Sequence, residues 1–164
     1  MATSTTVRPM GWLVLPCRVV LGGLFIVAGV MKLRDPQGFA EAIAAFKLIP
    51  ERADYLTVFT AFAMPWIELL AGAFLVIGLW ARASALLIGA LLVAFIVMIA
   101  SVLIRIKMGV QLSVSCTCFG ELEWPCGETL GMCQIWRDVV LLAMAVPVLV
   151  WGPGPLAIDR ESTR

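Results

Sequence analysis

Four of the five cysteines of this chain lie in one polar segment, "SVSCTCFGELEWPCGETLGMC" at residues 113–133. Cysteine thiolates attack disulfides, and they also bind soft metal ions. Three interpretations of the segment are therefore open: passive structural disulfides or unpaired thiols, a four-cysteine metal site, and a relay in which two cysteine pairs exchange electrons. The four residues are Cys116, Cys118, Cys126 and Cys133.

The spacing of these cysteines and the composition of the chain make a metal site the weaker interpretation. Structural zinc sites usually pair their ligands as C-x2–4-C, whereas only Thr117 separates Cys116 from Cys118. The chain contains no histidine, which excludes histidine-ligated haem, the usual histidine-containing zinc sites and Ser-His or Cys-His catalytic pairs. We therefore predict no metal ligands, and we expect cysteine, carboxylate, lysine, arginine or a bound cofactor to carry any chemistry.

The immediate surroundings of the segment favour the relay. A disulfide between Cys116 and Cys118 would close a small, strained ring, and strained disulfides are labile and oxidising. Lys107 and Arg137 flank the segment, and nearby cations stabilise the reactive thiolate. The alternative explanation for these two basic residues is that they anchor the ends of membrane spans.

Composition indicates the environment in which these thiols act. Of the 164 residues 62% are hydrophobic and 14% are charged, and the mean hydropathy is +1.00. Soluble domains are less apolar and more highly charged. The chain is therefore predicted to be an integral membrane protein in contact with the lipid bilayer. Its formal net charge of +1 and its lack of a basic run argue against a nucleic-acid partner.

Four windows are long and apolar enough to cross a bilayer, which requires about 20 residues each. They cover residues 11–31, 55–79, 83–104 and 135–151. The predicted fold is an all-α bundle of four transmembrane helices, forming one membrane domain over residues 11–152. The head at 1–10 and the tail at 153–164 are predicted to be disordered.

Two polar connectors fall on the same side of this predicted domain, opposite the termini. The stretch from Lys32 to Pro50 places Phe39, Ile43 and Phe46 on one helical face, which predicts an interfacial helix between helices 1 and 2; an ordinary polar connector is the alternative. The cysteine-rich loop, residues 107–134, joins helices 3 and 4. Four basic residues on this side are candidates to support the thiolates: Lys32, Arg105, Lys107 and Arg137.

Two charges lie well inside the predicted spans, Arg18 in the first and Glu68 in the second. Charges at membrane depth are costly and are usually paired or functional. Their approximate depths are compatible, so we hypothesise an intramembrane Arg18–Glu68 ion pair between helices 1 and 2. A polar wall along a quinone or proton path is the functional alternative. Cys17, far from the other cysteines, is interpreted as a packed small apolar residue.

Several motifs in order resemble the MauE branch of the DoxX-like membrane proteins. They are "RVVLGGLFIVAGVMKLRDPQGF", "KLIP", "PWIELLAGAFLVIGLWARAS", "CTCFGE" and "WRDVVLL", which span Arg18 to Leu142. The resemblance implies a four-helix membrane protein of methylamine utilisation, associated with thiol redox chemistry and maturation of an extracytoplasmic, disulfide-rich dehydrogenase subunit. It makes Cys116 and Cys118 the signature redox pair.

The four-helix bundle that the resemblance implies is also similar in concept to quinone-coupled membrane proteins that form disulfides. It implies exchange with a thioredoxin-like or disulfide-containing client, quinone as a possible electron acceptor, and Cys126 and Cys133 as a possible second pair. Two positions depart from the family pattern: Thr117 replaces a glycine between the signature cysteines, and Asp138 replaces an asparagine after the arginine of the last helix.

The orientation of the bundle is predicted from two conflicting arguments. Counting Lys and Arg places the cysteine loop in the cytoplasm. Disulfide chemistry and the resemblance place it on the oxidising side of a bacterial cytoplasmic membrane, and we follow them. The expected function is thiol–disulfide exchange that supports oxidative maturation or electron transfer toward quinone. The alternatives are a non-catalytic assembly factor with structural loop disulfides and a cysteine-ligated metal-binding membrane protein.

Overall fold

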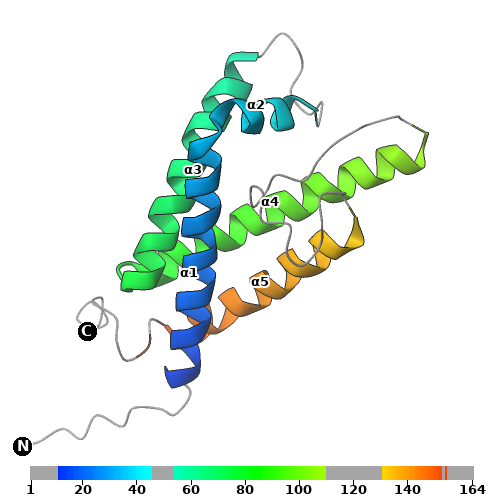
Figure 1. The fold of residues 1–164 in the computed structure, drawn as a ribbon. Helices are drawn as coiled ribbons and strands as arrows, with labels where there is room; N and C mark the ends of the chain where they lie inside the picture. Colours follow the sequence, from blue (N-terminus) through cyan, green and yellow to red (C-terminus); the bar gives the residue numbers. More distant parts are fainter. Residues whose placement is uncertain (1–10, 46–53, 110–130, 153, 155–164) are drawn as a thin grey trace, which may run out of the picture.

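The computed structural model describes residues 11–45, 54–109, 131–152 and 154, and these residues form five helices with short turns (Figure 1). No strand occurs within these ranges. The helices are α1 (Gly11–Arg34), α2 (Pro36–Ala45), α3 (Asp54–Ile77), α4 (Ala81–Lys107) and α5 (Met132–Trp151). The all-helical fold class is confirmed. Cys116, Cys118 and Cys126 lie outside the described residues.

Four of these helices are long and apolar enough to cross a membrane, as predicted. Two boundaries differ from the sequence-based expectation in ways that matter for the site. Helix α1 continues to Arg34, so Lys32 lies within a helix, and α5 begins at Met132, so Cys133 belongs to its first turn. Helices can continue past an apolar window because their polar ends find partners within the protein. The helix bounds are therefore set by these contacts as well as by hydropathy.

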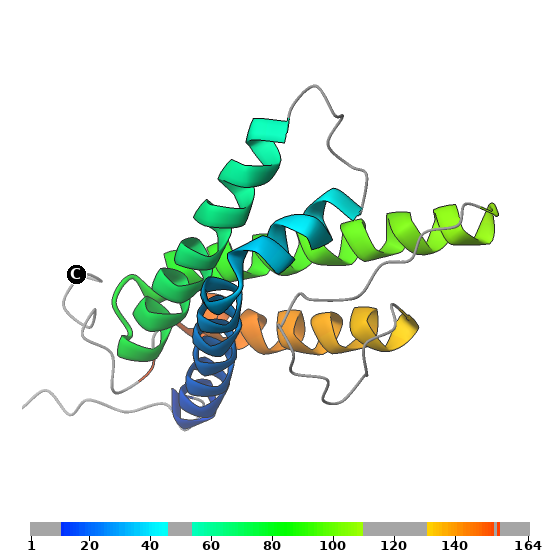
Figure 2. The ribbon, with the colours of Figure 1, turned by 45° about the horizontal axis from the view of Figure 1, so that its top comes forward.

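The long helices form two antiparallel pairs, α1 with α3 and α4 with α5 (Figure 1). The pairs cross near the turn between α3 and α4, and they diverge toward the ends that carry α2 and the start of α5 (Figure 2). The turn is tight because Gly78 and Trp80 both adopt left-handed backbone conformations, with φ of 78° and 49°. Gly78 N and Leu79 N both donate to the carbonyl of Phe74, which caps α3.

Helix α2 is short and starts at a clear sequence signal. Pro36 occupies its first position, and the Asp35 carboxylate accepts a hydrogen bond from Gly38 N at 3.0 Å. Phe39 is buried, whereas Glu41 on the other side of the helix is exposed. The predicted amphipathic helix is therefore present at 36–45, and its location at the membrane interface remains a prediction.

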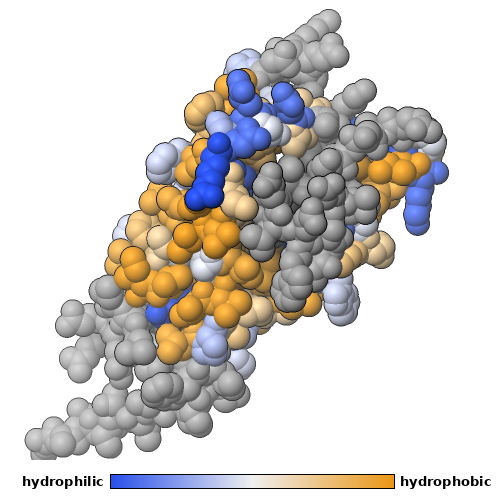
Figure 3. Space-filling model, viewed as in Figure 1, coloured by the Kyte–Doolittle hydropathy of each residue, from blue (hydrophilic) through white to orange (hydrophobic). Residues whose placement is uncertain are grey.

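Apolar side chains cover the middle of the molecule, and hydrophilic ones gather at the end that carries α2 (Figure 3). Inside the bundle, Leu21, Phe25, Leu75, Ile88 and Leu92 are among the fully buried core residues. Large apolar residues on the outward faces, such as the aromatic side chains along α3, remain exposed. Because lipid tails can solvate these faces, this distribution suits a bilayer better than water.

Glycine allows α1 and α3 to approach closely. A Cβ atom at Gly22 would lie 2.7 Å from the Gly72 carbonyl oxygen, and one at Gly72 would lie 2.7 Å from the Gly22 carbonyl oxygen. Gly29 is equally close to the carbonyl oxygen of Pro65, at 2.8 Å. Small residues at such positions let backbones pack without intervening side chains, which is a main source of helix association in membranes.

This packing predicts a position-specific cost of adding one methyl group. We expect Gly22→Ala to lower the free energy of unfolding by about 1–3 kcal/mol, because the new Cβ overlaps the backbone of α3. The measurement is thermal or denaturant unfolding of the purified protein in detergent. Gly23→Ala is the matched control, since nothing lies within 4 Å of its Cβ position. Equal effects of the two substitutions would contradict the close α1–α3 contact.

Candidate functional site

A buried ion pair connects α1 to α3. Lys32 Nζ donates to both carboxylate oxygens of Glu68, at 2.5 and 2.7 Å. Both side chains are only 1% exposed. Transferring two charges from water into a protein interior costs several kcal/mol per ion, and a contact to both oxygens offsets part of this cost.

Two aromatic rings complete the surroundings of the Lys32 ammonium group. The centroids of Phe39 on α2 and Phe95 on α4 each lie 5.1 Å from Lys32 Nζ. The faces of aromatic rings attract cations, and this attraction increases when water is excluded. Side chains from α1, α2, α3 and α4 therefore converge on one cation.

Helix α5 adds a second pair of opposite charges. The Nε and Nη2 atoms of Arg137 donate to Asp138 Oδ1, both at 3.3 Å. Asp138 is fully buried, and its Oδ2 atom has no hydrogen-bond partner among the described residues. Gln134, one turn earlier, is also buried, and its Oε1 atom accepts a hydrogen bond from Gly131 N at 2.9 Å. This bond caps the start of α5.

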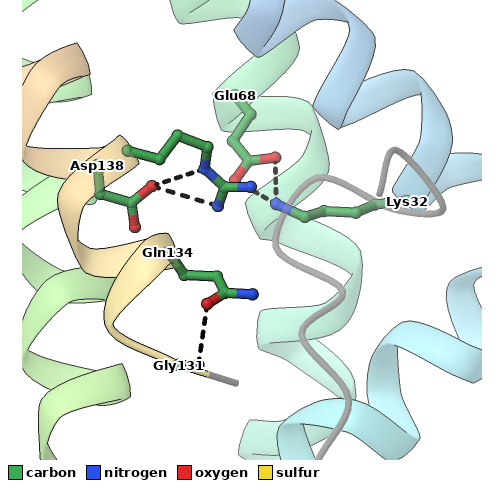
Figure 4. Close-up of polar contacts among 6 residues, drawn as sticks. Lys32, Glu68, Gly131, Gln134 and Asp138 are labelled. Atoms are coloured by element: carbon green, nitrogen blue, oxygen red, sulfur yellow. Dashed lines mark hydrogen bonds and ion pairs between the residues drawn. The ribbon is translucent and has the colours of Figure 1, made fainter. Parts of the chain in front are cut away.

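The two pairs belong to one group of side chains, the ionic cluster: Lys32, Glu68, Gln134, Arg137 and Asp138. Figure 4 shows the side chains of Lys32, Glu68, Gln134 and Asp138 pointing toward one another from α1, α3 and α5. Asp138 also lies within electrostatic range of Lys32. The cluster thus brings side chains of α1, α3 and α5 together near the end at which the helix pairs diverge, with one ion pair between α1 and α3 and one within α5.

The cluster lies at the end of the bundle from which the cysteine segment departs. Helix α4 ends at Lys107 before the segment, and α5 begins at Met132 after it. Cys133 is exposed in the first turn of α5, four residues before Arg137, so the two residues share a helical face. Cys17, by contrast, is a half-buried free thiol in α1.

The hypothesised Arg18–Glu68 ion pair is wrong. Glu68 binds Lys32 instead, and Arg18 is buried and donates from Nη2 to the carbonyl of Val76 at 3.1 Å. Val76 lies in the last turn of α3, where carbonyl groups lack partners within the helix. Lys32 is 14 residues beyond Arg18 on α1, or about 21 Å at 1.5 Å per residue, so the two basic residues serve opposite ends of the bundle.

The basic residues proposed to support the thiolates fall into two groups. Lys32 is buried and paired, so it is not an exposed membrane anchor, and Arg137 is half-buried and bound to Asp138. Arg105 and Lys107 lie in the last turn of α4. Sequence reasoning missed Gln134 as a site residue and treated Asp138 only as a departure from a pattern. Their four-residue spacing along α5 is the signal that places both on one buried face.

Removing Lys32 should reveal how strongly the cluster depends on its charge balance. We expect Lys32→Met to lower the free energy of unfolding by about 3–5 kcal/mol, because it leaves the Glu68 carboxylate buried without its cation. Adding Glu68→Leu should recover much of this loss, and unfolding in detergent measures both effects. Lys107→Met, at the exposed end of α4, is the control. If Lys107→Met lowers the free energy of unfolding as much as Lys32→Met does, the ion pair does not provide the predicted stabilisation.

Comparison with known proteins identifies the family. Residues 10–152 of the 164-residue chain match the profile of the family described as "Methylamine utilisation protein MauE". No curated protein and no solved structure matches the chain. The matched range includes every helix of the described residues and all residues of the ionic cluster. With four helices able to span a bilayer and this match over most of its length, the chain belongs to the MauE family of methylamine-utilisation proteins.

Proposed function

We propose that this MauE-family membrane protein catalyses thiol–disulfide exchange that supports disulfide formation in an extracytoplasmic protein of methylamine utilisation. The observation that carries the proposal is the position of Arg137. It connects the buried ionic cluster, through Asp138, to the face of α5 on which Cys133 lies exposed. Cys133 is disulfide-bonded in this structure. A cation on the same helical face and the helix N-terminus both favour the thiolate that leaves when such a disulfide is attacked.

The proposed reaction transfers two electrons from a client dithiol. A client thiolate attacks a Cys116–Cys118 disulfide, forming a mixed disulfide and releasing one thiolate of the pair. The second client thiolate then displaces the remaining cysteine, so the client gains one disulfide and Cys116 and Cys118 gain two electrons and two protons. Cys126 and Cys133 act as the second pair that re-oxidises the first.

The electron acceptor in this proposal is a quinone of the bilayer. It takes up two electrons and two protons from the second pair and becomes a quinol, which closes the cycle. Support comes from the membrane-spanning character of the four long helices, which gives a lipid-soluble oxidant direct access to the protein. The described cations near the segment, Arg105 and Lys107 on α4 and Arg137 on α5, favour the thiolate form of its cysteines.

The proposed orientation places the cysteine segment outside a bacterial cytoplasmic membrane. Disulfides persist on that side, whereas cytosolic reductants remove them. The count of Lys and Arg residues, which favoured a cytoplasmic loop, included Lys32 and Arg137. These two residues are bound by Glu68 and Asp138. Because these two are bound within the protein, they are weaker evidence for a cytoplasmic loop than free positive charges would be.

Trapping tests the exchange reaction. We expect Cys118→Ser or Cys116→Ser to accumulate a mixed disulfide with a client that already carries its disulfide, because the remaining thiolate attacks that bond in the reverse direction and the second cysteine of the pair is missing to release the client. The adduct should appear on non-reducing gels and disappear with dithiothreitol. Cys17→Ser, at the half-buried free thiol of α1, is the control and should trap nothing. Client maturation at the normal rate without Cys116 and Cys118 would instead indicate a non-catalytic assembly factor.

Thiol labelling in intact cells tests the orientation. In a Cys17→Ser background, we expect a membrane-impermeant maleimide to label the cysteine segment after treatment with an impermeant reductant. Mass spectrometry identifies the labelled residues. Labelling that requires cell lysis, with reduced thiols confirmed, would place the segment in the cytoplasm and contradict the proposed orientation.

A further inference from the structure

Trp66 occupies an unusual position on the outward surface of α3. The span that contains it runs from Tyr55 to Ile77, so Trp66 lies eleven residues from each end, or about 16 Å at 1.5 Å per residue. Its side chain is 53% exposed. By contrast, the exposed Trp80 and Trp136 lie near helix ends, where an indole ring meets the membrane surface. Trp66 therefore presents an indole ring near the middle of the bilayer.

The indole N–H of Trp66 needs a hydrogen-bond acceptor at this depth. It has no hydrogen-bond partner among the described residues. Lipid tails offer no acceptor, and a polar group without one in hydrocarbon costs free energy. A second copy of the chain offers none through its described surface, since the exposed polar side chains of these residues all lie near helix ends. The acceptor that fits is one carried by a small molecule dissolved in the bilayer.

Three further aromatic side chains continue from Trp66 toward the start of α3. Phe62, Phe59 and Tyr55 precede it at intervals of four, three and four residues, which places all four on one face of the helix. Their side chains are 58%, 69% and 70% exposed. Helix α3 lies at the edge of the bundle in both ribbon views (Figure 1, Figure 2). These four residues form a continuous surface, the aromatic face, that is open to lipid.

The aromatic face leads toward the end of the bundle from which the cysteine segment departs. Helix α3 begins at Asp54, α4 ends at Lys107 and α5 begins at Met132, and these three ends lie on the same side because successive long helices run in opposite directions. The other half of α3 exposes aliphatic side chains and one aromatic ring, that of Phe74. Exposed aromatic rings are thus concentrated in the half of α3 that leads to the end of the cysteine segment.

We propose that the aromatic face of α3 binds the ring of a lipid-soluble quinone and that the Trp66 indole N–H donates a hydrogen bond to a quinone carbonyl. A quinone ring is flat and electron-poor, so it stacks on the electron-rich faces of aromatic side chains. Its carbonyl oxygens supply the acceptor that the indole lacks. An exposed surface holds such a ring weakly, which lets the quinone move along the face toward the end of the cysteine segment. The role of this quinone as electron acceptor rests on the proposed function, whereas its binding does not.

Photolabelling tests this surface on the full-length protein in lipid nanodiscs. We expect an azido derivative of ubiquinone to label residues 55–66, as located by peptide mass spectrometry, and excess decylubiquinone to suppress the label. Trp66→Leu should raise the decylubiquinone concentration for half suppression about tenfold, because it removes both the donor and the ring. Trp66→Phe keeps a ring and should raise it about threefold. Phe74→Leu, in the other half of α3, is the matched control and should leave it unchanged.

Three results would overturn the quinone surface. The first is a label spread over all spans that excess decylubiquinone does not suppress, which indicates contact with a lipid-like molecule only. The second is equal suppression in the wild type and Trp66→Leu. The third is a dimer that Trp66→Leu dissociates, without suppressible labelling, which would assign the aromatic face to a second copy of the chain. Because Trp66 is exposed to lipid, the leucine variant should fold, and circular dichroism checks that it does.

The labelling experiment needs no cysteine, so its failure is distinguishable from failure of the proposed function. Suppressible labelling of α3 without any client trapped at Cys116 or Cys118 would support the quinone surface and count against thiol exchange. Client trapping without a label on α3 would support thiol exchange and overturn the quinone surface.

Discussion

The Lys32–Glu68 ion pair is the interaction on which the described part of the bundle depends. It forms between α1 and α3, whose backbones approach closely where Gly22 and Gly72 lack side chains. In a bilayer the apolar faces of helices gain little by leaving lipid, so close packing and buried polar contacts must hold the helices together. Between α1 and α3, the glycines allow the close packing, and the ion pair provides the buried polar contact.

The buried face of α5 faces the same pair. Lys32 lies near the end of α1 at which the helix pairs have diverged, and Gln134 and Asp138 of α5 lie beside it and Glu68 (Figure 4). The outer face of the same helical turns carries Cys133, which is exposed, and Arg137, which is half-buried. A change of charge on the buried face therefore acts on a helix that also carries the end of the cysteine segment.

Sequence alone predicted the four spans, because an apolar window long enough to cross a bilayer has few alternatives to forming a transmembrane helix in a membrane protein. It also placed Lys32 and Arg137 on the side of the cysteine segment. It failed to identify the partner of Glu68, because Lys32 was taken to lie beyond the end of its span and Arg18 seemed deep enough. The start signal of α2 at Asp35 and Pro36 marks where α1 must end, and it places Lys32 inside the helix. Distances across a bundle could not be obtained from counting along each helix separately, because the relative shift of α1 and α3 depends on how Gly22, Gly29 and Gly72 pack.

Asp138 gives the cluster a charge balance that an asparagine could not. Lys32 and Arg137 contribute two positive charges, and Glu68 and Asp138 contribute two negative ones. With the asparagine expected from the family pattern, three charges would remain, and the surplus positive charge of Arg137 would have to leave the core or find another anion. The carboxylate holds Arg137 at the boundary between the buried cluster and the exposed face of α5, at the cost of leaving one oxygen without a hydrogen bond. An asparagine amide at this position would carry no charge to balance that of Arg137. The departure from the pattern thus replaces an uncharged polar side chain with a carboxylate that binds Arg137 through charge-assisted hydrogen bonds.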